Sequence, residues 1–405
     1  MNVRRSAAAL AAAAVIGAAT PALAASPSPT PSVAIPDGLY GTADPTYDGV
    51  WRQSLALLAQ DTAGVVPADR AVAWLTGQQC ANGAFAAFRP DPAKPCDAKL
   101  MVDTNSTAAA VQALTALGGH TARTGKAVTW LKSVQNADGG WGYNPGGPSD
   151  ANSTAVVTGA LVAAGERPEQ VVKGGKSPYD ALLTFALPCT GDGAGAFAYQ
   201  PDKQGKLTAN ADATAAAVLG ALGQPLNASP KKADGTTSGC AAPTTPEQAA
   251  RNGARYLSTV LAKDHHLVSA LPGAENQPDY GNTADAVVAL AAAGHTDEAT
   301  AALRWLEANA PQWAAQSGPA AYAQLVLAAH ATGTDPRAFG STDLVRLLDA
   351  TGPAPKQTAT KSTASDTADD DGSSTTLWVT VGAVVLVVLV AAALFLARAR
   401  RRQQP

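Results

Sequence analysis

Apolar residues along this chain gather in runs rich in Ala, Val and Leu, each of which begins with a short polar cluster. Two runs, 103–114 and 150–161, are close copies that open with Asp, any residue, Asn, Ser and Thr. Weaker copies cover 210–221 and 281–290. Asp and Asn side chains cap the free N–H groups at a helix start, and a helix that is apolar on nearly every face is buried. The pattern therefore predicts four buried helices.

A second kind of helix alternates with the buried ones and carries an aromatic residue followed by Leu. These aromatic residues are Trp74, Trp130, Tyr256 and Trp305. Charged residues elsewhere on these helices predict that one face is exposed to solvent. We add 48–60 and 319–332 to the buried set. To the outer set we add 341–350 and the segment at Phe185, a degenerate copy of the aromatic position. The sequence then predicts six inner and six outer helices in alternation.

This alternation predicts an all-α fold, an α6/α6 toroid in which outer helices surround a closed barrel of inner helices. The toroid is expected to occupy residues 37–352. An open solenoid of the same helix pairs is the alternative. Closure hides the end faces that a solenoid has to cover with capping repeats, so the closed form is favoured.

The two ends of the chain carry segments of a different kind. Residues 1–25 are expected to be a secretory signal peptide, because a basic start and a small-residue apolar stretch precede an Ala-Leu-Ala cleavage site. A Pro/Ser-rich linker follows at 26–36. Near the other end, 353–375 has the composition of a disordered Thr/Ser/Asp stalk.

The segment 376–397 predicts one C-terminal transmembrane helix. Its residues from 377 onward are uncharged over a length that crosses a bilayer. The basic tail 398–405 belongs in the cytoplasm by the positive-inside rule, which places the toroid outside the cell. The expected location is therefore the cell membrane, with a single span and an extracellular ectodomain.

The charge of the chain excludes one class of partner. Only 15% of the residues are charged, and the formal net charge is −3. Nucleic-acid binding normally needs a basic surface, so we expect no nucleic-acid partner.

A short motif follows two of the predicted outer helices. In it a Gly lies four residues after a Gln, and an aromatic residue lies two residues after the Gly. The QW-like residues are Trp130, Gln135, Gly139 and Trp141 in one copy, and Trp74, Gln79 and Phe85 in the other. This motif resembles the repeat of the squalene cyclases and the protein prenyltransferases, and the helix pairs extend the resemblance over most of 45–350. The resemblance implies an α/α toroid. We expect the motif itself to be structural, with Gln bonded to a neighbouring helix end and Trp packed between outer helices.

The catalytic residues of those families have no counterpart at matching positions. The nearest approach to the D-x-D-D acid of the cyclases is the Asp run 369–371, which lacks the spacing and lies in the stalk. No cysteine has Asp two residues before it, as the prenyltransferase zinc site requires. The inner helices also lack the aromatic residues that stabilise carbocations. We expect no catalytic residue, no metal ion and no cofactor; a divergent terpene cyclase or prenyltransferase-type enzyme with a non-standard site is the alternative.

Four cysteines in an exported chain are expected to form disulfides. Three connectivities exist, and the most local one pairs Cys80 with Cys96 and Cys189 with Cys240. Each bridge would close a loop that follows an outer helix.

If the inner helices run parallel, their polar clusters gather at one mouth of the barrel, where the incoming loops add aromatic residues. Such a mouth suits a medium-sized, partly apolar ligand. Helix capping and loop packing are the alternative explanation of these residues. The candidate ligand-binding residues are Asp103, Asn105, Tyr143, Asp150, Asn152, Tyr199, Asn210, Asp212, Tyr280, Asn282 and Asp285.

The expected architecture also resembles that of the transcobalamin-type corrinoid binders, which are exported and disulfide-bonded. The small β-domain of those proteins has no counterpart in this sequence. The two resemblances imply a corrinoid or an isoprenoid ligand. The sequence thus predicts a non-catalytic binding module for a hydrophobic or corrinoid-like ligand, with a role in uptake, or for a surface partner such as a membrane transporter.

Overall fold

Thirteen α-helices make up most of the regular structure in residues 34–232, 239–269 and 275–356, which are the residues that the computed structural model describes. Two short antiparallel strand pairs accompany them. They are β1 (Phe85–Ala86) with β2 (Val102–Asp103), and β3 (Leu267–Val268) with β4 (Pro278–Asp279). The predicted all-α class is confirmed.

Several of the predicted segments lie outside the described residues. These are the signal peptide 1–25, most of the linker 26–36, most of the stalk 353–375, the membrane segment 376–397 and the tail 398–405. Among the helices of the described ranges, none has the length and apolar character needed to cross a membrane.

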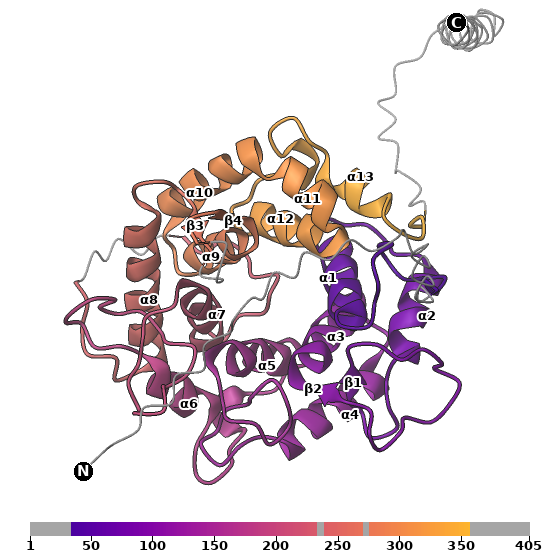
Figure 1. Ribbon diagram of the computed structural model, residues 1–405, viewed down its shortest axis with the longest axis horizontal. Helices are drawn as coiled ribbons and strands as arrows, with labels where there is room; N and C mark the ends of the chain where they lie inside the picture. The colour runs from indigo at the N-terminus through magenta and orange to yellow at the C-terminus, as the bar shows by residue number, and fades with distance from the viewer. Residues whose placement is uncertain (1–33, 233–238, 270–274, 357–405) are drawn as a thin grey trace, which may run out of the picture. The chain divides into compact units, whose positions relative to one another are not determined.

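Six helices form an inner layer, and each packs against the next one along the chain. They are α1 (Gly49–Thr62), α3 (Thr104–Leu117), α5 (Ala151–Ala163), α7 (Ala211–Ala221), α9 (Tyr280–Ala292) and α12 (Pro319–Ala331). The last of them, α12, also packs against α1 (Figure 1). Small side chains bring these helices close together: a Cβ added to Gly220 of α7 would lie 2.7 Å from the Cα of Ala155 in α5.

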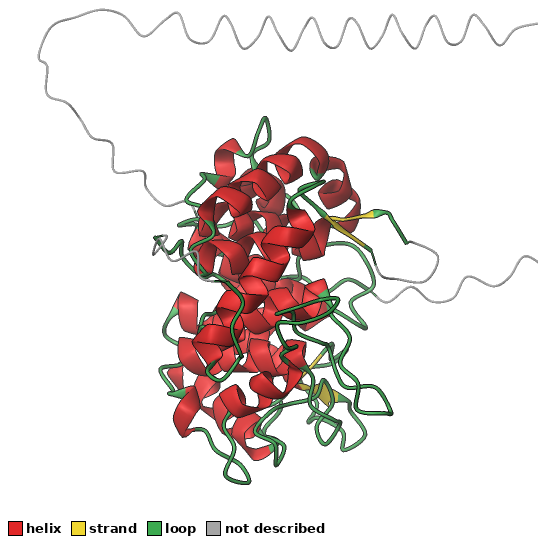
Figure 2. Ribbon diagram, turned by 90° about the vertical axis from the view of Figure 1, so that its left-hand side faces the viewer, coloured by secondary structure: helices red, strands yellow, loops and turns green. Residues whose placement is uncertain are grey.

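Six outer helices each pack against the inner helix that precedes them in the chain. They are α2 (Asp69–Gly77), α4 (Thr121–Ser133), α6 (Pro178–Phe185), α8 (Pro246–Leu261), α10 (Thr296–Asn309) and α13 (Leu344–Asp349). One further helix, α11 (Pro311–Ser317), and two 3-10 turns, η1 (Pro168–Gln170) and η2 (Pro336–Ala338), lie in the connections. Both strand pairs lie on the same side of the helical layers (Figure 2).

Four inner helices begin with the same capping interaction. The N-cap residues of α3, α5, α7 and α9 are Asp103, Asp150, Asn210 and Asp279. Each side chain accepts a hydrogen bond from the backbone N–H three residues later, at 2.6–3.1 Å. Such a cap stabilises a helix by about 1 kcal/mol. The fourth repeat differs from the sequence expectation, because its cap precedes the segment 281–290 by two residues.

A buried threonine four residues after each cap ties the inner helix to the loop that enters the repeat. The hydroxyls of Thr107, Thr154, Thr214 and Thr283 accept hydrogen bonds from the backbone N–H of Phe85, Trp141, Phe197 and Leu267, at 2.9–3.1 Å. All four threonines are inaccessible to solvent. These threonines lie within the repeated segments, but the sequence pattern did not predict their role.

The QW-like motif joins one repeat to the next outer helix. The Nε2 of Gln135 donates to the carbonyl oxygens of Gly139 and Val171, at 2.8 and 3.0 Å. Gln79 bonds in the same way to its own turn and to Arg123, near the start of α4. The indole of Trp141 is fully buried, and its Nε1 donates to the carbonyl oxygen of Leu131. These hydrogen bonds hold each turn against residues of the following repeat or the preceding helix.

Both predicted disulfides are confirmed. Cys80 pairs with Cys96, and Cys189 pairs with Cys240; the Cα atoms are 5.6 Å apart in each bridge. The first bridge closes the loop after α2, and the second closes the longer connection between α6 and α8.

The first residues of the predicted stalk, 353–356, contact the helical unit. The hydroxyl of Tyr40 donates to the carbonyl oxygen of Pro353. The backbone N–H of Lys356 donates to the carbonyl oxygen of Val66. The Lys356 ammonium also lies 2.6 Å from Asp69. The folded unit therefore extends four residues beyond the boundary expected from composition.

Replacing Gly139 by alanine should destabilise the fold strongly. Its φ is +87°, and an added Cβ would lie 2.2 Å from the carbonyl oxygen of Ser177, the N-cap of α6. We expect Gly139→Ala to lower the free energy of unfolding by more than about 3 kcal/mol. Gly146→Ala is the matched control, because its φ is +78° with no atom within 4 Å, and it should cost only about 1 kcal/mol. Denaturant titrations that give equal losses would contradict this packing role.

Removing the two disulfides should have unequal effects. They link residues 16 and 51 positions apart, so the chain-entropy model assigns about 3 kcal/mol to Cys80–Cys96 and about 4 kcal/mol to Cys189–Cys240. Double Cys→Ala variants of each bridge, compared by urea unfolding, test this order. A larger loss for the shorter loop would show that native contacts, rather than loop length, set the stabilisation.

Candidate functional site

A cavity of about 200 Å³ lies between the inner helices, and every one of them contributes to its wall. We call it the central cavity. Its lining residues are Trp51, Leu55, Asn105, Asn152, Val156, Asp212, Ala215, Ala216, Leu219, Leu226, Asp285, Val288, Gln324 and Leu327.

The lining of the central cavity is divided into a polar end and an apolar end. Asn105, Asn152 and Asp212 are each the second residue of their helix, so they lie at the end where the inner helices begin. Asp285 and Gln324 follow within the second turn of α9 and α12. Leucine and valine residues line the helices further along. The cavity can therefore accept a polar group at one end and an apolar group at the other.

The segment 224–232, which follows α7, closes the apolar end. Leu226 lines the cavity, and its backbone N–H donates to the Oε1 of Gln112 in α3 at 2.8 Å. Gln112 in turn donates to the carbonyl oxygen of Val156 in α5. The segment then reaches α9, where the N–H of Lys231 donates to the carbonyl oxygen of Ala291. It thus crosses from α7 past α3 and α5 to the C-terminal end of α9.

Two carboxylate–amide contacts organise the polar end. The Nδ2 of Asn152 donates to an Asp212 oxygen at 2.9 Å. The Nε2 of Gln324 lies 3.2–3.3 Å from both oxygens of Asp285. The Oδ1 of Asn152 is buried and has no hydrogen-bond partner in the described part of the chain. The polar end therefore contains acceptor atoms whose hydrogen-bonding capacity the described residues only partly satisfy.

The electrostatics of the polar end are strongly acidic. Burial raises the pKa of Asp285 to about 7, and the nearby Asp212 and Asp279 carboxylates act in the same direction. Burial also raises the pKa of Asp212, against the lowering effect of the Asn152 hydrogen bond. Asp285 is partly accessible to solvent, and it lines the cavity. Protein atoms surround the rest of its carboxyl group.

Four of the candidate residues predicted from sequence meet in the central cavity, namely Asn105, Asn152, Asp212 and Asp285. Asp103, Asp150 and Asn210 do not line it, because their side chains are occupied in capping α3, α5 and α7. The structure thus separates the predicted polar ring into a capping set and a cavity set.

The aromatic candidates lie elsewhere. Tyr143 and Tyr199 are exposed, and their backbone carbonyl oxygens accept hydrogen bonds from the first turns of α3 and α5. Tyr280 stacks against Trp305 and Trp313, with ring centroids 5.3 and 5.4 Å apart. Together with Asn282 it lines a separate open groove beside Trp313. The predicted aromatic mouth is therefore not part of the central cavity.

The sequence pattern did not predict two large residues that line the cavity, Trp51 and Gln324. Their helices, α1 and α12, lack the polar cluster at the start. The number of residues between the N-cap and a position could have indicated which side chains face the cavity. Positions two and six after the cap lie on one helix face, and in α5 they are Asn152 and Val156. In α9 the second position is Gly281, and the sixth is the cavity residue Asp285.

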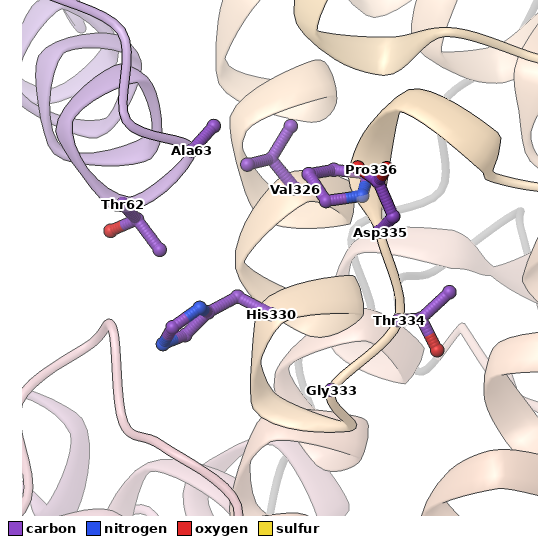
Figure 3. A pocket seen from close by; sticks show the side chains of 8 residues that line it. All are labelled: Thr62, Ala63, Val326, His330, Gly333, Thr334, Asp335 and Pro336. Atoms are coloured by element: carbon purple, nitrogen blue, oxygen red, sulfur yellow. The ribbon is translucent and has the colours of Figure 1, made fainter. Parts of the chain in front are cut away.

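A second cavity, of about 230 Å³, opens between the ends of α1 and α12. There His330 extends from α12 towards Thr62 of α1 (Figure 3). Burial lowers the pKa of His330. The side chain of Asp335 is already used, since it accepts a hydrogen bond from the backbone N–H of Arg337. Only two inner helices line this cleft, so we take the central cavity as the candidate site.

The arrangement offers no evident metal site: within the described ranges, no group of three or more His, Cys, Asp or Glu side chains could hold a metal ion. The central cavity instead combines acceptors for hydrogen bonds with an apolar wall. Within the cavity, Asp285 is a carboxyl group whose pKa burial raises to about 7.

No protein-family model matches the chain, and no curated protein matches it significantly. Among solved structures, a protein from Actinoplanes is similar with a TM-score of 0.46 and 16% sequence identity. The alignment covers 74% of this chain and 94% of that one. This likeness is too weak to support an argument about fold or function.

The raised pKa of Asp285 predicts a specific pH dependence of stability. The unfolded chain loses this proton near pH 4, whereas the folded protein keeps it to about pH 7, so the free energy of unfolding should fall between these values. Asp285→Asn should flatten this decline. At pH 8 the variant should be more stable than the wild type by about 1–3 kcal/mol, below the ceiling of about 4 kcal/mol because solvent in the cavity screens the charge.

Urea unfolding at several pH values measures this effect. Asp192→Asn, which changes an exposed carboxylate in a loop, is the control and should leave the pH profile unaltered. An Asp285→Asn profile that runs parallel to the wild type would show that Asp285 ionises normally.

Proposed function

We propose that this chain is a non-catalytic binding protein, a closed α6/α6 toroid that holds a compact amphipathic ligand in its central cavity. The observation that carries the proposal is the division of one cavity, lined by all six inner helices, into a polar and an apolar end. Enclosed sites with a few convergent polar groups on an apolar wall are the usual form of small-molecule binding sites.

Contacts between the two ends of the helical array support closure over an open solenoid. Besides the packing of α12 on α1, the Nε2 of Gln60 donates to Asp349 of α13 at 2.6 Å. The guanidinium of Arg337 donates to the carbonyl oxygen of Ala63, just after α1. An open array would leave these first and last helices without each other as partners.

The size of the cavity limits the ligand. An engineered apolar cavity of about 150 Å³ binds benzene, whereas drug-sized ligands need roughly 300–1,000 Å³. A cavity of about 200 Å³ therefore suits one ring or a short alkyl chain with a polar head group. A corrinoid or a long isoprenoid would have to bind at the mouth or displace the segment 224–232.

The two disulfides support a location in an oxidising compartment. Together with the predicted signal peptide and membrane segment, they support an extracellular toroid on a single-pass anchor. We propose that it presents its ligand to a membrane partner such as a transporter. The paired bonds of Gln79 and Gln135 support a relationship to the prenyltransferase and squalene cyclase repeats.

One observation favours an enzyme as the second candidate. Asp285 is a carboxyl group that keeps its proton near neutral pH beside an apolar wall, which is the property of a general acid. Among the described residues that line the cavity, Trp51 is the only aromatic one, so a carbocation would find little stabilisation there. Binding is therefore the better-supported function.

A ligand screen by thermal unfolding tests the binding function. We expect small amphiphiles such as benzyl alcohol or butylamine to stabilise the full chain in lipid nanodiscs, by about 2.7 kcal/mol at a hundredfold excess over Kd. Ala216→Phe should abolish the response, because Ala216 lines the cavity and the new ring would fill it. Ala211→Phe, on the same helix but outside the lining, is the matched control and should retain it.

Two outcomes would overturn this proposal. A response that survives Ala216→Phe would place the ligand elsewhere. Turnover of farnesyl diphosphate that is lost in Asp285→Asn would establish the enzyme instead.

A further inference from the structure

We propose that the central cavity selects ligands whose head group is an ammonium, held by Asp212, Asp285 and the Asn152 amide, with a single ring or short alkyl group against the apolar wall. This inference rests on the proposed binding function and specifies its ligand class.

The charge of the lining is the first argument. Asp212 and Asp285 both face the cavity, and neither takes part in any ion pair of the described residues. Among the described residues, no Lys, Arg or His lines the cavity. The other charged groups that act on these two carboxylates are also acidic, namely Asp150 and Asp279. Buried charge without a partner is costly, so a ligand that carries the missing positive charge gains the most on binding.

The acceptor atoms are the second argument. An ammonium group donates three hydrogen bonds and accepts none. The polar end offers the carboxylates of Asp212 and Asp285, and also the Oδ1 of Asn152, which is buried without a partner in the described part of the chain. The Nδ2 of Asn152 donates to Asp212, which leaves the amide oxygen as the acceptor without a partner among the described residues. An ammonium group would supply the donors that these acceptors lack.

The apolar end distinguishes an organic ammonium from a metal ion. A bare cation would use only the oxygen atoms and would leave the wall formed by residues such as Leu55, Leu219 and Leu327 without a function. The absence of a metal-ligand cluster in the described ranges agrees with this choice. The volume of about 200 Å³ leaves room beside the head group for about one ring.

A matched pair of probes tests the proposal, because benzylamine and benzyl alcohol share a ring and differ in charge. Calorimetric titration of the full chain in lipid nanodiscs at pH 8 should give at least about 30-fold tighter binding for benzylamine. Asp212→Asn and Asp285→Asn should each remove most of this preference while benzyl alcohol still binds. Asp192→Asn changes an exposed loop residue outside the lining and should leave the preference unchanged.

The outcomes separate this inference from the function on which it rests. Equal affinity for both probes, abolished by Ala216→Phe, would overturn the ammonium preference and keep the binding site. Failure of both probes, and of the wider set of amphiphiles, would overturn both. Retained binding of benzyl alcohol by the Asn variants shows that they are folded, so a lost preference then reports on charge.

Discussion

The arrangement of this protein depends on how the inner helices satisfy the backbone N–H groups of their first turns. In four repeats an Asp or Asn cap accepts one of these N–H groups, and the threonine four residues later accepts an N–H from the incoming loop. Cap and threonine together fix the loop, the start of the helix and its rotation. Because the rotation is fixed, the residue two positions after the cap faces the centre in α3, α5 and α7. The polar end of the cavity therefore follows from the same interaction that stabilises each repeat.

Much of the helical layout could be predicted from sequence, because its signals are local. The apolar runs, the caps Asp103 and Asp150 and the short-range pairing Cys80–Cys96 each depend on residues close together in the chain. The cavity was only partly predictable. Trp51 and Gln324 reach it through packing of α1 against α12, which no local pattern records. Tyr280 lies outside the central cavity because its ring stacks with Trp305 and Trp313, which come later in the chain.

Burying the acidic groups of the cavity costs folding free energy, and the other contacts between inner helices carry no such cost. Elsewhere the inner helices meet through alanine, valine and leucine, and their buried polar side chains are mostly bonded to backbone. At Asp285 the cost appears as a pKa near neutrality, and at Asn152 as an oxygen without a partner among the described residues. Local departures of this kind from an otherwise consistent design are typical of functional sites.

The floor of the cavity is a connecting segment, while its walls are helices. Leu226 is held there by one backbone hydrogen bond to Gln112 and by its neighbours in 224–232. Loops accept substitutions and insertions more readily than packed helices do. The depth of the cavity can therefore diverge between descendants of this gene while the inner helices stay unchanged. A designer who wishes to lengthen the accepted ligand would rebuild this one segment and leave the repeats alone.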